Sequence, residues 1–454
     1  MEATVQGVNT LAKLKRIIAI AVPAVIESIV SVVISAIDTQ MISGLGMGAV
    51  SAVSFTSQPK LIILSIFFAL GTAVSVFVAQ ALGRRDGAEA NAYFQTILRI
   101  TVILSLVVGA LAGALAGPIM SICNRQPDTV GMSVSFFRII MLFLVFNAVS
   151  IVLNAALRGI GRTRLPLISG IGMGAVDILV NYLLIEGHWG FPRLGVVGDA
   201  LGTVCGMAAA CVISIALLSK RSGFLTLKGL LTPVRDPKIM KNIRVKAGDT
   251  VAENLFTRIG FLLSSIIVSG LPSDLTAVYS VTMILLNYSF SFGDGLQAAV
   301  VALTGQSVGA GRYREARDYV RLSRIVGAAV SIALSAAYIL GARGFFGQFF
   351  RDGEAVAQGV SYTFVAATLT LLQIVRIINV AAMRGMGDFT SPRRMATVCV
   401  LFVNPAVAFV LTSVLSCGMW GVWTASLTSQ LCWFVMSCVM ARRCMRRTLE
   451  PRPA

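Results

Sequence analysis

The chain alternates between long apolar stretches and short segments that are rich in polar and basic residues. An apolar helix of about 20 residues crosses a hydrocarbon core of roughly 30 Å, and lipid offers the backbone no hydrogen-bond partners, so each stretch of this length predicts a transmembrane helix. Twelve such stretches occur, at residues 17–41, 54–82, 93–121, 130–157, 165–186, 195–219, 244–270, 275–306, 319–342, 358–383, 393–416 and 419–441. The pattern therefore predicts an all-α membrane protein.

Several motifs recur at one constant offset of 226 residues. The matched pairs are Ala79–Gly83 with Gly305–Gly309, Arg158–Gly161 with Arg384–Gly387, and Glu27 with Glu253. A constant offset indicates two copies of one unit, and six spans in each copy return the chain to the same side of the membrane. The sequence thus predicts two six-helix lobes that are parallel repeats, an organisation typical of secondary transporters.

The repeat also predicts the domain limits. We expect an N-terminal lobe at residues 1–219, a cytoplasmic linker at 220–243, a C-terminal lobe at 244–441 and a basic tail at 442–454. The linker carries Pro233 and Pro237 and is polar, and the tail is expected to lie at anionic headgroups.

The charge of the chain follows its topology. There are 38 Lys and Arg residues against 20 Asp and Glu, a net charge of +18. Most of the basic residues fall at the two termini and in alternate loops, which is the positive-inside bias and places both termini in the cytoplasm. We therefore expect a multi-pass protein of the plasma (inner) membrane that binds no nucleic acid. The exceptions are Lys60, Arg125, Arg193, Arg343 and Arg351, assigned to the outer side, and Arg99, Arg138, Arg258 and Arg376 within spans.

Several kinds of chemistry are disfavoured. The eight cysteines are scattered without a C-x-x-C pair, and His188 is the one histidine, so neither a disulfide framework nor a His cluster is expected. No Walker motif is present, which leaves an ion gradient as the common source of energy for transport. The chain is not expected to be an enzyme or to need a cofactor, because only an Asp38–Asp177 dyad could serve an intramembrane reaction.

Embedded acids are the strongest candidates for function, because charge inside a bilayer is costly. Asp177 and Asn181 lie one helical turn apart on one face. Counting depth along the spans places Asp38, Asp177, Asn181 and Thr203 in the outer half of the first lobe. We expect these four side chains to form an ion-coupling site. The alternative is a buried polar network that only holds helices together.

The repeat provides a control for this interpretation. The positions 226 residues after Asp38, Asp177 and Asn181 are Ser264, Val403 and Val407. The outer polar cluster therefore exists in the first lobe alone, and the symmetry of the scaffold does not explain it.

A second set of embedded charges comprises Glu27, Glu253, Asp294 and Arg376, which we assign to a substrate cavity. Glu253 is expected either to pair with Arg258 or Arg376 or to face the cavity and meet a cationic substrate. Asp294 is flanked by two glycines, which allow another backbone to approach. The small-residue motifs at 79–83 and 305–309 predict close helix packing.

Motifs along nearly the whole chain resemble those of the MATE (multidrug and toxic compound extrusion) family. They are VPAVIESIVSVVISAIDTQMISGLG in the first span, VAQALGRRD and its repeat GQSVGAGR, NAALRGIGRTRLP and GFPRLGVVGDALGTV. The resemblance implies two lobes around a central cleft and export of hydrophobic organic cations by proton or sodium antiport through alternating access. It also implies a monomer in the lipid bilayer.

The resemblance places the family's first-span acid on Asp38 and its sixth-span threonine on Thr203. The Asn-x-x-x-Asp pattern of the DinF-like branch is reversed here, as Asp177-x-x-x-Asn181. The seventh-span glutamate of the NorM-like branch falls on Glu253, but the tenth-span aspartate of that branch is missing. The resemblance is thus closer to the DinF-like branch, and it implies a sodium site at Asp38, Asp177, Asn181 and Thr203 if sodium is the coupling ion. The main alternative function is that of a lipid-linked oligosaccharide flippase of the same superfamily.

Overall fold

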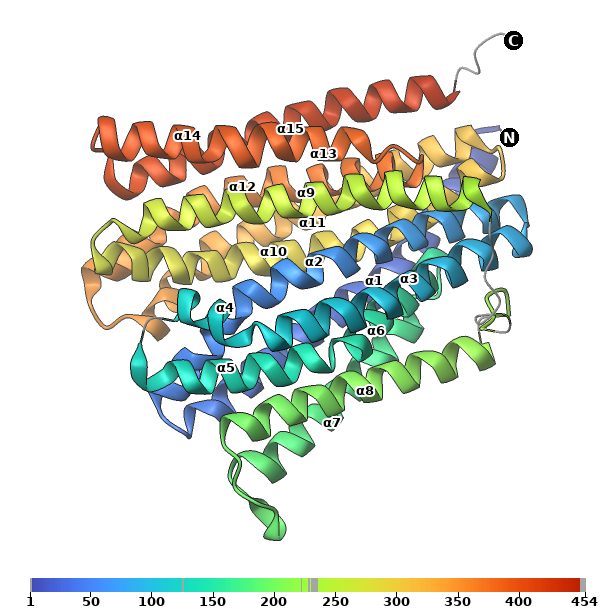
Figure 1. The fold of residues 1–454 in the computed structure, drawn as a ribbon. Helices are drawn as coiled ribbons and strands as arrows, with labels where there is room; N and C mark the ends of the chain where they lie inside the picture. The colour runs from blue at the N-terminus through green and yellow to red at the C-terminus, as the bar shows by residue number, and fades with distance from the viewer. Residues whose placement is uncertain (1, 125, 222, 228, 230–235, 450–454) are drawn as a thin grey trace. The chain divides into compact units, whose positions relative to one another are not determined.

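The computed structural model describes residues 2–124, 126–221, 223–227, 229 and 236–449, and every regular element within these ranges is a helix (Figure 1). The elements are α1 (Glu2–Ser43), α2 (Met47–Arg84), α3 (Gly87–Ala114), α4 (Ala116–Cys123), α5 (Pro127–Leu142), α6 (Leu144–Gly159), α7 (Arg164–Ile185), η1 (His188–Gly190), α8 (Val196–Arg221), α9 (Pro237–Ser269), α10 (Ser273–Gly309), α11 (Tyr313–Phe349), α12 (Gly353–Gly385), α13 (Thr390–Ala396), η2 (Thr397–Val403), α14 (Asn404–Phe409), η3 (Val410–Val414) and α15 (Gly418–Leu449). The all-α prediction is confirmed.

The described residues also contain the predicted number of spans. Eleven helices are long and apolar enough to cross a membrane, and α5 with α6 forms a twelfth span that is bent by 53°. The bend lies at Phe143, whose backbone (φ −101°, ψ 18°) leaves the helical geometry. On α3, Gly109 lies so close to the carbonyl oxygen of Met141 that an added Cβ would stand 2.5 Å from it. A glycine on the neighbouring helix therefore makes room for the bend.

The chain divides by its contacts into two compact units. One unit is Ile26–Ala247, and the other combines Met1–Val25 with Gly248–Ala454. The start of α1 joins the second unit because Lys13 forms an ion pair with Asp318 (2.6 Å) and Arg16 donates to Gln306 (3.0 Å). The limits of the lobes and linker that the repeat predicts stay a prediction.

Glycines bring helices together at equivalent places in the two units. Gly159 of α6 lies against the backbone of Ser75 on α2, and a Cβ at this position would collide with the Ser75 carbonyl oxygen. A Cβ on Gly385 of α12 would stand 3.0 Å from Thr304 Cβ and 3.3 Å from the backbone nitrogen of Gly305 on α10. Close approach of this kind lets helices associate in lipid through van der Waals contact.

The eleventh span, Thr390–Val414, is not a regular α-helix. Its segments η2 and η3 are π-helical and flank the short α14, which has Pro405 in its first turn. π-Helical turns are rare, and they occur frequently at functional sites.

Candidate functional site

The polar cluster of the first repeat lies entirely within the unit Ile26–Ala247. The side-chain nitrogen Nδ2 of Asn181 lies 3.3 Å from Oδ1 of Asp38 and 3.3 Å from Oδ1 of Asp177. Asp177 and Asn181 are buried one turn apart on α7, and Asp38 is half-buried near the end of α1. A single amide thus bridges two carboxylates from different helices.

Close packing of α8 against α7 encloses this cluster. A Cβ at Gly202 would collide with Oδ1 of Asn181, and a Cβ at Gly206 would lie 2.9 Å from Cβ of Asp177. These glycines are one turn apart, so they present a continuous strip of backbone to α7. Thr203, the fourth predicted member, is half-buried on α8, and within the described chain it forms no hydrogen bond to the other three.

Two further charged residues belong to the cluster, and the sequence analysis did not assign them to it. Asp199 on α8 is only 2% exposed and interacts electrostatically with Asp38. Lys60, counted above with the outer loops, lies within α2 and interacts with Asp38, Asp177 and Asp199. The positions 226 residues later are Leu286 and Ala425. The same test of repeat symmetry that singled out Asp38 would therefore have found both residues.

The donor atoms of the cluster are suited to a small cation. Oδ1 of Asn181 and Oδ1 of Asp199 are buried and have no hydrogen-bond partner in the described part of the chain. Oxygen atoms are the ligands that hard cations prefer. Three carboxylates against one ammonium leave net negative charge when all are ionised. The described residues do not, however, place three such side chains at metal-binding spacing, so the predicted sodium site is not preassembled.

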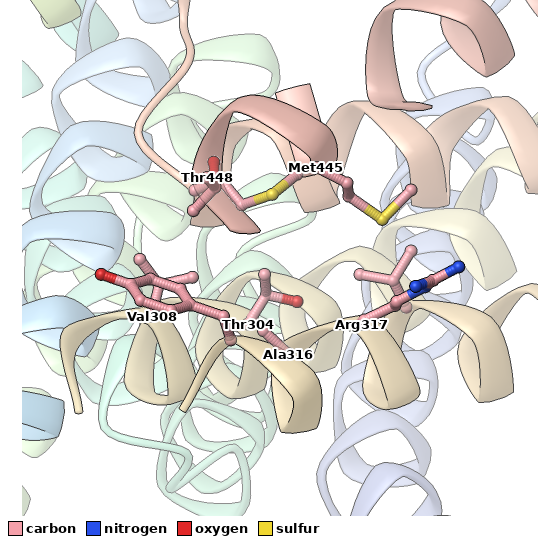
Figure 2. Close-up of a pocket in the computed structure, with 9 residues that line it drawn as sticks. Thr304, Val308, Ala316, Arg317, Met445 and Thr448 are labelled. Carbon is pink, nitrogen blue, oxygen red and sulfur yellow. The ribbon is translucent and has the colours of Figure 1, made fainter. Parts of the chain in front are cut away.

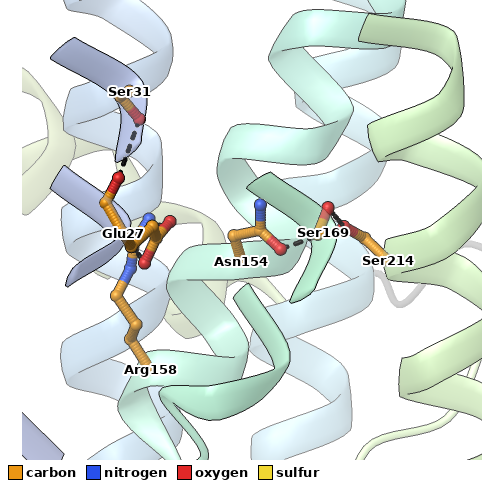
Figure 3. Close-up of polar contacts among 6 residues, drawn as sticks. All are labelled: Glu27, Ser31, Asn154, Arg158, Ser169 and Ser214. Carbon is orange, nitrogen blue, oxygen red and sulfur yellow. Dashed lines mark hydrogen bonds and ion pairs between the residues drawn. The ribbon is translucent and has the colours of Figure 1, made fainter. Parts of the chain in front are cut away.

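Glu27, predicted to line a substrate cavity, forms an ion pair with Arg158 of α6, with Nη1 3.1 Å from Oε1 (Figure 3). One turn before Arg158, Asn154 accepts a hydrogen bond from Ser214 (2.9 Å), whose hydroxyl lies 2.8 Å from that of Ser169 (Figure 3). Polar side chains of α6, α7 and α8 are therefore satisfied by one another beside the Glu27–Arg158 pair.

Glu253 forms the equivalent ion pair in the other unit. Nη2 of Arg384 lies 2.8 Å from Oε1 of Glu253, and Nη1 lies 3.2 Å from Oε1 of Gln297. The predicted partners of Glu253, Arg258 and Arg376, are therefore wrong. The reason is the repeat itself, because Arg384 is the counterpart of Arg158 and each pair joins residues 131 positions apart.

The remaining cavity candidates lie in the same unit as Glu253. Arg376 is buried, and its guanidinium carbon lies 3.7 Å from the ring centroid of Trp433, a cation–π contact. Asp294 is exposed and interacts electrostatically with Arg376.

Two hollows of very different size occur. The one drawn in Figure 2, between α10, α11 and α15, has a volume of about 10 Å³, room for a single water at most. The other has a volume of about 470 Å³ and is lined by residues of the α1–α2 turn, α5 and the start of α8. Its lining residue Val196 precedes Asp199 by one helical turn.

Comparison with known proteins agrees with this architecture. A family model described as MatE matches residues 23–183 and 250–410, one segment in each half, which confirms the internal repeat. The uncharacterised transporter YisQ of Bacillus subtilis is 23% identical over 411 residues, which cover 89% of this chain and 88% of YisQ. A probable multidrug resistance protein NorM of Thermotoga maritima is 22% identical over 410 residues, which cover 90% of this chain and 88% of that protein.

A solved structure of an outward-facing multidrug resistance transporter of the MATE family, in the MOP superfamily, shares the fold. The TM-score is 0.89 at 17% identity, and 97% of both chains is covered. Because the family model matches most of the chain, in both halves, the chain belongs to the MatE family and is a multi-pass membrane transporter rather than an enzyme.

Proposed function

We propose that this chain exports hydrophobic organic cations in exchange for a proton or a sodium ion. The observation that carries the proposal is the cluster of Asp38, Asp177, Asn181, Asp199 and Lys60, which is built into one repeat only. Relatives named as multidrug resistance proteins support the class of substrate. The protein would act as a monomer in the plasma membrane, with both termini in the cytoplasm.

The cluster suggests how exchange could work. With its carboxylates ionised, the first lobe carries net negative charge, which favours a cationic substrate. Binding of a proton or sodium ion at Asp38 and Asp177 removes that charge, so the substrate leaves when the site faces outward. The hollow next to Asp199 offers a route for the small ion. Alternating access of one site to the two sides of the membrane then couples the two fluxes.

We infer that the chain lies nearer to the DinF-like than to the NorM-like branch, because its clustered acids lie in the N-terminal lobe. In the other unit the corresponding charges are occupied: Glu253 pairs with Arg384, and Arg376 stacks on Trp433.

The second candidate is a lipid-linked oligosaccharide flippase. The buried cations Arg376 and Arg384 favour it, since a pyrophosphate lipid needs a basic site. Arg384 already pairs with Glu253, however, and the three carboxylates of the other unit would repel a polyanion. Complementation of a flippase-deficient strain separates the two functions, because only a flippase restores growth.

The decisive experiment is transport by the Asp38→Asn variant in proteoliposomes. Ethidium efflux is measured under an imposed pH gradient and, separately, under a sodium gradient. The wild type should respond to one of the two, and Asp38→Asn should lose the gradient-driven component. Asp128→Asn, which changes an exposed acid at the start of α5, is the matched control and should retain it. Full gradient-driven efflux by a folded Asp38→Asn protein would overturn the proposal.

A further inference from the structure

Three sulfur atoms meet in the unit that contains the C-terminal half of the chain. Sγ of Cys399 lies 3.5 Å from Sγ of Cys432 and 3.6 Å from Sδ of Met436, and the last two atoms are 4.0 Å apart. Cys399 comes from the π-helical segment η2, whereas Cys432 and Met436 lie one turn apart on α15. We propose that these three side chains form a binding site for a soft monovalent metal ion, Cu(I).

The spacing of the sulfurs carries the proposal. The point equidistant from all three lies about 2.1 Å from each, close to the metal–sulfur bond length of about 2.3 Å for zinc thiolates. A bound ion would therefore need only a slight outward movement of the ligands. Three sulfurs packed merely as apolar groups have no reason to form a nearly equilateral triangle of this size.

The chemistry of the ligands selects the ion. Thiolate and thioether sulfurs are soft ligands and favour Cu(I). Structural zinc takes four ligands from Cys, His and carboxylates, and the described residues contain no group of three or more of these side chains at metal-binding spacing. A site of two thiols and one thioether therefore suits Cu(I) better than zinc.

The backbone around Cys399 is held in place. The hydroxyl of Ser429 on α15 donates a hydrogen bond of 2.7 Å to the carbonyl oxygen of Cys399. This contact joins η2 to the helix that supplies the other two sulfurs. Since π-helical turns occur frequently at functional sites, the local geometry of η2 is an independent indication that Cys399 has a role beyond packing.

The surroundings can accept the charge of the complex. Cu(I) with two thiolates and a thioether carries one net negative charge, after each thiol has released its proton. The guanidinium of Arg376 interacts electrostatically with Cys399 and lies over Trp433, which directly follows Cys432 in the chain. Arg376 also interacts with Glu253, Asp294 and Arg384, so the complex would join a network that holds both signs of charge. Cys432 is half-buried and offers the first point of contact for an incoming ion.

The test is a titration of the reduced, purified protein with Cu(I) under anaerobic conditions, with bathocuproine disulfonate as the competing chelator. The wild type should retain one Cu(I). Cys399→Ser and Cys432→Ser should weaken that binding by at least about tenfold, a loss that changes in outer-shell partners already cause at metal sites. Cys444→Ser is the matched control, since this thiol also lies on α15 but contacts a single sulfur, Sδ of Met386 at 4.0 Å.

Two further measurements keep the proposal falsifiable. Met436→Leu preserves the size of the side chain and should lower the affinity without unfolding the protein, which thermal unfolding of the metal-free form checks. X-ray absorption should show copper surrounded by sulfur only, and by fewer sulfurs in Met436→Leu. Equal affinity in the wild type and both serine variants, or no retained Cu(I) in a wild type with free thiols, would overturn the site.

Discussion

Arg158 and Glu27 form an ion pair that recurs as Arg384 and Glu253, exactly one repeat further along the chain, with N···O distances of 3.1 and 2.8 Å. The two pairs differ in exposure. The side chains of Arg158 and Glu27 are 30% and 14% exposed, whereas those of Arg384 and Glu253 are 9% and 8% exposed. The same contact therefore lies in a drier environment in the second unit, and we expect its loss to cost more there.

Arg384→Gln should destabilise the protein by about 3–5 kcal/mol, because it leaves the Glu253 carboxylate buried without a partner. Arg158→Gln should cost less, since water reaches part of that pair. Thermal unfolding in detergent compares the two variants. The double variant Glu253→Gln with Arg384→Gln removes both charges and should regain much of the loss. Equal destabilisation by the two single variants would contradict this account.

Lys60→Gln should strengthen binding of the coupling cation. The lysine interacts with three carboxylates, and its removal leaves their negative charge less compensated. The half-saturating concentration of the coupling ion for ethidium efflux should fall. Lys238→Gln changes an exposed lysine at the start of α9 and should leave this concentration unchanged. A rise in the Lys60→Gln variant would show that the lysine supports ion binding rather than competing with it.

Gly202→Ala should damage the polar cluster through packing alone. The added methyl group would collide with Oδ1 of Asn181, and overpacking of a tight contact costs about 1–3 kcal/mol. Gradient-driven efflux and thermal stability should both fall. Gly131→Ala on α5 is the control, because nothing lies within 4 Å of an added Cβ there. Its stability should stay the same or rise by about 0.5–1 kcal/mol, as is usual for alanine in place of a helical glycine.

Much of the fold could be predicted because span length and motif spacing are properties of the chain itself. The bent span α5–α6 was predicted as one helix, since hydropathy carries no information about a bend at Phe143. The meeting of Asp38, Asp177 and Asn181 followed from helical periodicity combined with depth along the spans. Lys60 and Asp199 were missed because depth counting placed one in a loop and gave the other no role.

The sequence by itself determined the number of spans, the internal repeat, the family and the asymmetry of the acids, since each depends on residue type and spacing alone. Only the tertiary structure decided the partner of each charge: Arg384 for Glu253, Arg158 for Glu27, and Lys60 for the three carboxylates. It also brought together the sulfurs of Cys399, Cys432 and Met436. The physical reason is that such contacts depend on which helix faces meet and how closely glycines let them approach, and hydropathy records neither.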